Sequence, residues 1–248
     1  MAFYAKKVNK YFQLDKQEEV GMIKAVFFDM NETLLDLKSL DLAFAKHFDD
    51  KYVSKYWFTK LLQTSQVMGS MKKYTNFANL AYVVLENVFY EAGKDLSQED
   101  KSIILSSFRN MPAYSDVKES LDLLKKNEIK VIAVSNSSLD MMEEQLRNSG
   151  IVEFFDAYYS VDAVSCYKPF EDIYKYVARS EKVELDQVVM VACHDWDLFG
   201  AKSAGLKTAY IERKKVIYNP YYLKADIGDT NMVELSKKIV NMNKEVKI

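Results

Sequence analysis

Short runs dominated by apolar residues recur along the chain, and they restrict the fold more than any other feature of the sequence. Each run is only a few residues long and is rich in β-branched or aromatic side chains. Such a run is too short for a typical helix and predicts a strand that is buried on both faces of a parallel sheet. The runs occupy residues 23–28, 130–134, 155–161, 188–191 and 207–211.

Segments with helical periodicity alternate with the last four of these runs. Their apolar residues recur at three- and four-residue spacing, and Gly150 and Gly205 follow two of them as natural helix ends. Alternation of strand and helix predicts right-handed crossovers, and therefore an α/β fold with a parallel sheet flanked by helices. The predicted helices span residues 116–127, 139–149, 170–181 and 197–204.

A long insertion separates the first two runs, and its periodicity is helical throughout. Ser97 begins the sequence SQED, in which it is expected to cap a helix. A block of helices after the first strand indicates a domain boundary, so we predict a core formed by residues 22–36 and 112–248 and a helical bundle over residues 37–111. The four predicted helices of the insertion span residues 40–48, 55–66, 74–92 and 97–109.

The composition argues against several classes of protein. The chain has 34 Lys and Arg against 36 Asp and Glu, a net charge of −2, so we predict no nucleic-acid partner. No apolar run approaches the roughly 18 residues of a membrane span. The two cysteines, Cys166 and Cys193, cannot build a disulfide framework and suit the cytoplasm. Residues 1–21 are mixed and charged, and we interpret them as an N-terminal extension outside the fold.

Polar side chains follow four of the predicted strands directly. Asp29 follows the first strand, Ser135 and Asn136 follow the second, and Lys168 and Asp197 lie beyond later ones. Parallel strands of one sheet bring their carboxyl ends to one edge, so these groups are expected to converge. The set suits an aspartate nucleophile, because an ammonium would keep Asp29 ionised while hydroxyl and amide donors hold a negatively charged substrate.

Four segments in this order resemble the motifs of the haloacid dehalogenase superfamily, and most closely its type II branch, the (S)-2-haloacid dehalogenases. The segments are FFDMNETLLD, VSNSS, YKP and HDWDLFGAKSAGL. The resemblance runs from Met22 to the C-terminal region and includes the insertion. It implies a Rossmann-like core, a helical cap that closes over the site, and an aspartyl-ester intermediate.

The resemblance also implies roles for the residues that match the motifs. Asp29 resembles the nucleophile, and Thr33 resembles the hydroxyl that hydrogen-bonds it. Lys168 resembles the lysine that pairs with the nucleophile. Asp197 resembles the carboxylate that helps to position this lysine and the hydrolytic water. These four are the predicted catalytic residues.

Six further residues are predicted to bind substrate. Ser135 and Asn136 resemble donors for the substrate carboxylate and the leaving group, and Tyr174 matches a tyrosine of the dehalogenase site. Three others depart from the family: Asn31 replaces a tyrosine, His194 replaces an asparagine, and Phe58 stands where a cap arginine holds the departing halide. Glu32, which replaces a glycine of the family, is expected to narrow or charge the pocket.

Two positions distinguish dehalogenation from phosphate-ester hydrolysis, the common activity of the superfamily. The phosphatases use a second aspartate as general acid where this chain has Asn31, and a magnesium-binding aspartate where it has Cys193. A halide leaves without a proton, whereas an alkoxide needs one. We therefore predict a metal-independent and cofactor-free hydrolase that acts on a short 2-haloalkanoate or a similar small carboxylate.

Two alternatives stay open at this point. One is a phosphatase with a rearranged magnesium site that uses Asp195, and the other is a catalytically weak binding protein on the same fold. A homodimer through the aromatic-rich cap is expected by analogy with relatives alone.

Overall fold

Six parallel strands form one sheet in the order β3-β2-β1-β4-β5-β6 in the computed structural model, which describes residues 21–245. Every neighbouring pair is parallel, as the alternating sequence pattern predicts. The strands are β1 (Ala25–Phe28), β2 (Lys130–Ser135), β3 (Ala157–Ser160), β4 (Val188–Ala192), β5 (Lys207–Ile211) and β6 (Ile227–Asp229). All residues of β1 and β4 are buried, so these two strands form the centre of the core.

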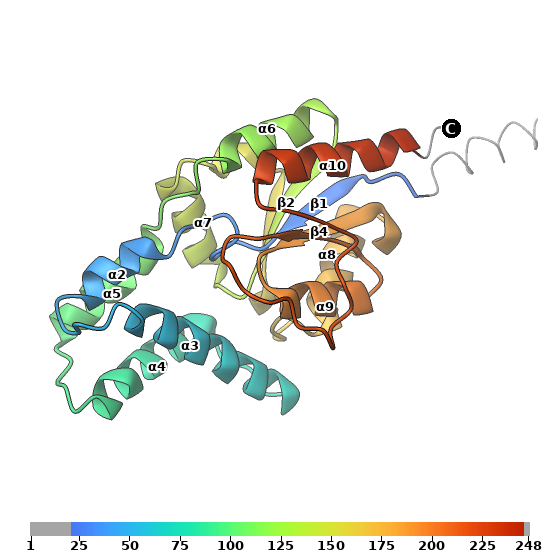
Figure 1. Ribbon diagram of the computed structural model, residues 1–248. Coiled ribbons are helices and arrows are strands. Elements are labelled where there is room, and N and C mark those ends of the chain that lie inside the picture. Colours follow the sequence, from blue (N-terminus) through green and yellow to red (C-terminus); the bar gives the residue numbers. More distant parts are fainter. Residues whose placement is uncertain (1–20, 246–248) are drawn as a thin grey trace, which may run out of the picture.

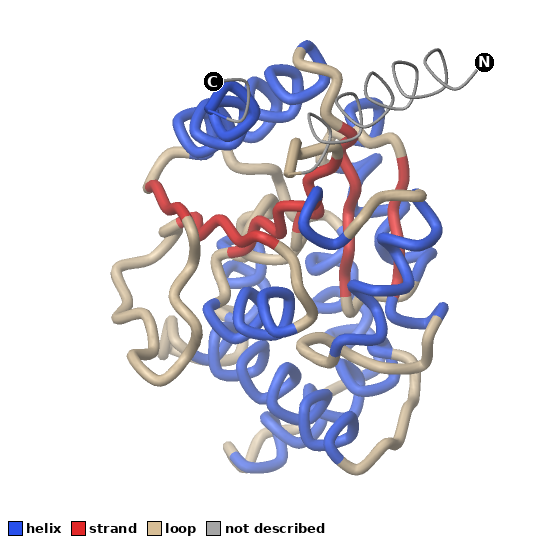
Figure 2. Tube along the Cα trace, turned by 90° about the vertical axis from the view of Figure 1, so that its right-hand side faces the viewer, coloured by secondary structure: helices blue, strands red, loops and turns tan. Residues whose placement is uncertain are grey.

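Helices cover both sides of the sheet (Figures 1 and 2). In Figure 1, α6 and α10 lie above the strands and α8 and α9 lie below them. The core helices are α6 (Val117–Lys126), α7 (Leu139–Asn148), α8 (Glu171–Glu181), α9 (Asp195–Ser203) and α10 (Met232–Glu245). The fold is therefore the predicted α/β arrangement.

Four helices lie between β1 and α6 in the chain and stand to one side of the sheet (Figure 1). Aromatic side chains fill their shared interior. The ring centroid of Trp57 is 5.9 Å from that of Phe44 and 5.5 Å from that of Phe108. These helices are α2 (Lys38–Phe44), α3 (Val53–Ser70), α4 (Phe77–Glu91) and α5 (Gln98–Arg109).

The chain crosses between the sheet and the four helices twice, and the two crossings are hydrogen-bonded to each other. The backbone N–H of Asp36 donates to the carbonyl of Pro112 at 2.8 Å, and that of Tyr114 donates to the carbonyl of Leu34 at 3.0 Å. We propose, in line with the sequence pattern, that the core comprises residues 22–36 and 112–248 and the cap residues 37–111. The predicted extension over residues 1–21 lies, except for Gly21, outside the described residues.

Hydrogen bonds to N-capping side chains explain where two of the four inserted helices begin. The Ser97 hydroxyl accepts from the N–H of Asp100 at 3.0 Å, which confirms the predicted cap of α5. The predicted start of α4 at Tyr74 is wrong by three residues, because the Asn76 side chain accepts from the N–H of Ala78 at 2.8 Å and starts the helix at Phe77. The helix predicted over residues 40–48 extends too far, since α2 ends at Phe44.

Candidate active site

Asp29 lies at the carboxyl end of β1, where the central strands β1 and β4 run side by side. This is the point at which the strand order changes direction, the usual ligand position in an open parallel sheet. Its Oδ1 accepts from Nζ of Lys168 at 2.8 Å, and its Oδ2 accepts from the hydroxyl of Thr33 at 2.7 Å. The structure thus brings together three of the four predicted catalytic residues around one carboxylate that is only 5% exposed.

Lys168 links this carboxylate to the fourth predicted catalytic residue. Its Nζ donates to Oδ2 of Asp197 at 2.7 Å and to the carbonyl of Val134 at 3.0 Å, in addition to Asp29. All three ammonium protons therefore have an acceptor. The charged end is wholly buried, so its attraction to the two carboxylates is only weakly screened by solvent.

Asp197 lies in the first turn of α9 and is fixed from a second side by Tyr174 of α8. The Tyr174 hydroxyl donates to Oδ1 of Asp197 at 2.5 Å. Close approach of α9 to the loop after Lys168 depends on Gly200, because a Cβ atom there would lie 2.2 Å from the carbonyl oxygen of Pro169. The structure thus places Tyr174 against Asp197, and its predicted contact with substrate stays a prediction.

The two carboxyl groups that share Lys168 have their pKa values moved in opposite directions. Burial opposes ionisation of Asp29, but the charge of Lys168 and the hydrogen bond from His194 outweigh it and hold the pKa of Asp29 well below its ordinary value. Burial raises the pKa of Asp197 above its ordinary value, because the opposing charge of Lys168 does not outweigh burial and the nearby charge of Asp29 adds to it. Asp29 is therefore the group that stays ionised, as a nucleophile must.

Asn136 has a buried amide donor without a partner. Its Oδ1 accepts from the backbone N–H of Lys168 at 2.9 Å, which fixes the orientation of the amide. Its Nδ2 has no hydrogen-bond partner among residues 21–245. An unsatisfied buried donor is costly, and an acceptor such as a carboxylate oxygen or a halide would satisfy it. Next to it, the Ser135 hydroxyl accepts from the N–H of Ser137 at 3.1 Å.

Asn31 is held within the protein by both ends of its amide. Its Nδ2 donates to the Ser137 hydroxyl at 3.2 Å, and its Oδ1 accepts from Nε2 of Gln145 at 3.2 Å. The same Gln145 nitrogen donates to the carbonyl of Phe108 at 3.0 Å, so this network joins the site to the cap helix α5. The predicted contact of Asn31 with substrate stays a prediction.

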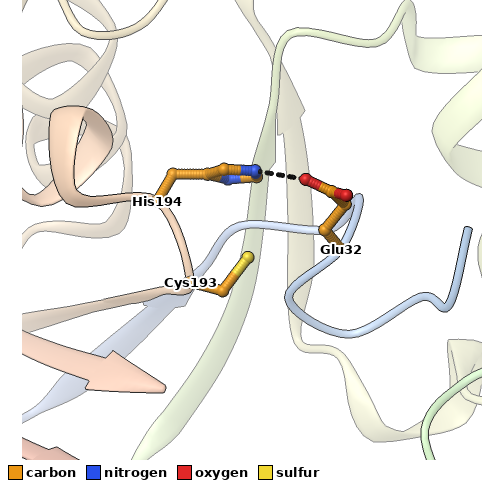
Figure 3. A group of neighbouring side chains, drawn as sticks. All are labelled: Glu32, Cys193 and His194. Atoms are coloured by element: carbon orange, nitrogen blue, oxygen red, sulfur yellow. Dashed lines mark hydrogen bonds and ion pairs between the residues drawn. The ribbon is translucent and has the colours of Figure 1, made fainter. Parts of the chain in front are cut away.

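His194 follows β4 and lies between two carboxylates. Its Nδ1 is 3.0 Å from Oδ2 of Asp29, and its Nε2 is 3.0 Å from Oε2 of Glu32 (Figure 3). Burial alone would lower the pKa of His194, but the adjacent Cys193 sulfur and the Asp29 carboxylate raise it well above its ordinary value. The protonated form of the imidazole, which can donate to both carboxylates, is therefore favoured. Glu32 also pairs with Lys214.

Phe58 lies in the cap interior. It is 3% exposed, and its ring centroid is 6.4 Å from that of Trp57 and 6.0 Å from that of Phe108. These contacts place an apolar ring at the position that the resemblance gives to a halide-binding arginine. The predicted contact of Phe58 with substrate stays a prediction.

A cavity of about 270 Å³ opens between cap and core beside Glu32. Glu32, which forms part of its wall, is joined through His194 to Asp29. The volume suits a small carboxylate, and cationic side chains outnumber acidic ones in the lining. The charged lining residues are Glu32, Asp36, Lys38, Asp41, Lys51, Lys55, Arg213 and Lys214.

The donor atoms near Asp29 do not fit a magnesium ion. Cys193 occupies the position of a metal-binding aspartate, and its sulfur is a poor ligand for a hard cation. The Asp195 carboxylate accepts from the backbone N–H groups of Trp196 at 2.8 Å and Asn219 at 3.0 Å. Asp195 thus holds the backbone. The geometry therefore gives no support to the alternative of a phosphatase with a rearranged magnesium site that uses Asp195.

One other group with metal-ligand chemistry occurs in the part of the chain that the structure describes. Donor atoms of Glu32, Cys193 and His194 lie within 4.8 Å of one another (Figure 3). Glu32 is already paired with Lys214 and hydrogen-bonded to His194. Because these interactions satisfy the carboxylate and the imidazole, we assign no metal to the group.

Three site residues escaped the sequence-based prediction, and each depends on contacts between distant segments. Gln145 and Ser137 hold Asn31, and Lys214 reaches Glu32 from the segment after β5. Ser137 lies in the segment VSNSS but received no role there, and no motif includes Gln145 or Lys214. Glu32 itself stands out in the sequence as a charged residue in place of a glycine, but its pairing with His194 does not follow from that substitution.

The family model described as haloacid dehalogenase-like hydrolase matches residues 23–205. Two curated relatives are (S)-2-haloacid dehalogenases. The one from Pseudomonas sp. strain YL is 28% identical over 195 residues, which cover 77% of this chain and 83% of the relative. The one from Xanthobacter autotrophicus is 28% identical over 194 residues, which cover 77% of this chain and 76% of the relative.

A solved structure with the same fold is the L-2-haloacid dehalogenase from Xanthobacter autotrophicus with chloropropionic acid covalently bound. It superimposes with a TM-score of 0.83 at 23% identity, covering 88% of this chain and 98% of that one. The parallel sheet, the flanking helices and the inserted helices of the two proteins are therefore alike.

Proposed function

This chain belongs to the haloacid dehalogenase-like hydrolases, and we propose that it cleaves the carbon–halogen bond of a short 2-haloalkanoate, with Asp29 as nucleophile and without a metal. The observation that carries the proposal is a buried carboxylate, Asp29, that is held by a buried ammonium, with an amide in place of a carboxylic acid at the general-acid position of the phosphatases. Lys168 and Thr33 hold Asp29, whereas the amide of Asn31 is engaged by Ser137 and Gln145 at the position where the phosphatases have their general acid. Such a site suits a leaving group that departs as a stable anion.

In the first half-reaction, a carboxylate oxygen of Asp29 attacks the carbon that bears the halogen. The new carbon–oxygen bond forms as the carbon–halogen bond breaks, and the halide leaves with the bonding electron pair. Lys168 and Thr33 fix the orientation of the carboxylate, and the unpartnered Nδ2 of Asn136 offers a hydrogen bond to the substrate carboxylate or to the departing halide. In the second half-reaction, water attacks Cγ of Asp29, releases a 2-hydroxy acid and restores the carboxylate.

The substrate class agrees with the names of the relatives. The two cysteines of the chain are both free, which favours a reducing compartment such as the cytoplasm. No helix within residues 21–245 has the length and apolar character needed to cross a bilayer. A homodimer stays a prediction.

The purified chain is expected to release chloride from (S)-2-chloropropionate and bromide from the corresponding bromide, with the same rate in EDTA. Halide and 2-hydroxy acid should appear in equal amounts. Absence of halide release from every 2-haloacid tested would remove the proposal. Hydrolysis of p-nitrophenyl phosphate that needs magnesium and stops in EDTA would instead support the phosphatase alternative.

A further inference from the structure

Glu32 has three features that the two half-reactions above do not use. Its φ is 64°, a left-handed conformation that is unfavourable for a residue with a side chain. The residue is only 8% exposed although it is charged. Its carboxylate binds both His194 and Lys214. A strained, buried and fully engaged carboxylate at an active site indicates a positioning role.

His194 is held in one orientation by the groups around it. Its Nδ1 is 3.0 Å from a carboxylate oxygen of Asp29. Its Nε2 is 3.0 Å from a carboxylate oxygen of Glu32 (Figure 3). Its ring stacks on Trp196 with centroids 5.2 Å apart. The backbone of the neighbouring Cys193 is tied to the nucleophile loop, because its N–H donates to the Thr33 hydroxyl at 3.0 Å.

We propose that His194 is the general base that activates the water for hydrolysis of the ester on Asp29, and that Glu32 is its positioning residue. Asp29, His194 and Glu32 form a chain of nucleophile, imidazole and carboxylate. In such a chain the carboxylate fixes the tautomer and the orientation of the imidazole. This inference rests on the function proposed above, since it concerns the second half-reaction.

The competing base in the site is Asp197, and it is less well placed. Its Oδ2 is bound by Lys168 and its Oδ1 by Tyr174, and the side chain is wholly buried. The side chain of His194 is 11% exposed, so water has access to it. The titratable groups around the imidazole are Asp29, Glu32, Cys193, Tyr114 and Tyr210, with Lys214 beyond Glu32.

The protons balance over one turnover. Formation of the ester removes the negative charge of Asp29, so Nδ1 releases its proton to solvent while Glu32 holds the proton on Nε2. Nδ1 then takes a proton from the water as its oxygen bonds to Cγ. Collapse of the tetrahedral intermediate breaks the bond between Cγ and the product oxygen, which takes that proton from Nδ1. The carboxylic acid left on Asp29 returns its own proton to Nδ1 and restores the resting pair.

The test separates the two half-reactions by rapid quench in His194→Gln, with (S)-2-chloropropionate as substrate. The variant should release about one chloride per enzyme at nearly the wild-type rate and then hydrolyse the ester roughly 10²- to 10⁴-fold more slowly. Mass spectrometry should find the ester accumulated on the peptide that contains Asp29. His47→Gln is the matched control, because His47 is the other histidine of the chain and pairs with Asp100 in the cap.

Glu32→Gln tests the positioning role, since glutamine can still accept a hydrogen bond but carries no charge. Ester hydrolysis should slow by roughly 10-fold, and its pH profile should move to lower pH because the negative charge that favours the protonated imidazole is lost. A merely structural role of Glu32 would leave the pH profile unchanged, and that result would overturn this part of the inference.

The outcomes distinguish this inference from the proposed function. If the wild type releases no halide, the proposed function fails. If the wild type releases halide but His194→Gln shows no burst and no ester, only the role of His194 fails. If EDTA stops ester hydrolysis in the wild type and zinc restores it, Glu32, Cys193 and His194 hold a metal ion instead, and the general-base assignment is overturned.

Discussion

Asp29→Asn is expected to lose halide release by roughly 10⁴-fold or more, because no other group can form the covalent ester in its place. An asparagine amide has nearly the same shape but is a far weaker nucleophile than a carboxylate. It also leaves Lys168 with one charged partner, Asp197, in place of two. The measurement is the initial rate of chloride release from (S)-2-chloropropionate.

Two controls make this result specific. Asp29→Ala removes the side chain without the option of slow conversion back to aspartate, and it should be equally inactive. Asp122→Asn, an exposed aspartate paired with Lys126 on α6, should keep the wild-type rate. Substantial halide release by both Asp29 variants would mean that another group carries the reaction. An equally low rate in the wild type would favour the alternative of a catalytically weak binding protein.

Lys168→Met is expected to lower the free energy of unfolding by about 3–5 kcal/mol at neutral pH, because it leaves two buried carboxylates without their shared cation. Activity should fall by roughly 10²-fold or more, since burial then favours the protonated form of Asp29, which is not nucleophilic. Urea denaturation at pH 7 measures the first effect. Lys126→Met is the matched control. Because Lys126 forms a solvent-exposed ion pair with Asp122, its replacement should change the free energy of unfolding by less than about 1 kcal/mol.

The loss caused by Lys168→Met should shrink as the pH falls. In the wild type, the depressed pKa of Asp29 stabilises the fold above the pKa of an unfolded aspartate, and this contribution is lost as the pH falls through the folded pKa. In the variant, burial raises the carboxyl pKa values, so that folding is favoured by protonation. A difference in stability that stays constant from pH 7 to about pH 4 would contradict this account.

The central strands and the polar residues after them could be predicted from the sequence because short buried runs leave few alternatives. Five of the six strands of the described part coincide with predicted runs. The sixth, β6, consists of Ile227–Asp229 and has no apolar pattern, because it lies at the edge of the sheet and pairs only with β5. Asp29, Thr33, Lys168 and Asp197 converge because the strands before them, β1, β3 and β4, are parallel and lie within four consecutive positions of the sheet.

The side-chain partners could not be predicted in the same way, because they depend on angstrom-scale placement of loops. The pairing of His194 with Glu32 arises where the segments after β4 and β1 meet, and the Lys214 contact comes from a segment without a motif. The left-handed backbone at Glu32 agrees with the glycine that the resemblance places there, but the sequence alone does not say what the carboxylate binds. For the same reason, Tyr174 could be assigned to the site but not to Asp197.

The central claim is that Asp29 becomes covalently bound to the substrate and that water attacks its Cγ. The direct test is a single turnover in H₂¹⁸O, with enzyme in excess over (S)-2-chloropropionate, followed by mass spectrometry of the product and of the peptide that contains Asp29. We expect an unlabelled hydroxyl in the product and one ¹⁸O in the Asp29 carboxylate. An ¹⁸O label in the product hydroxyl, with none in Asp29, would show that water displaces the halide directly and would contradict the account.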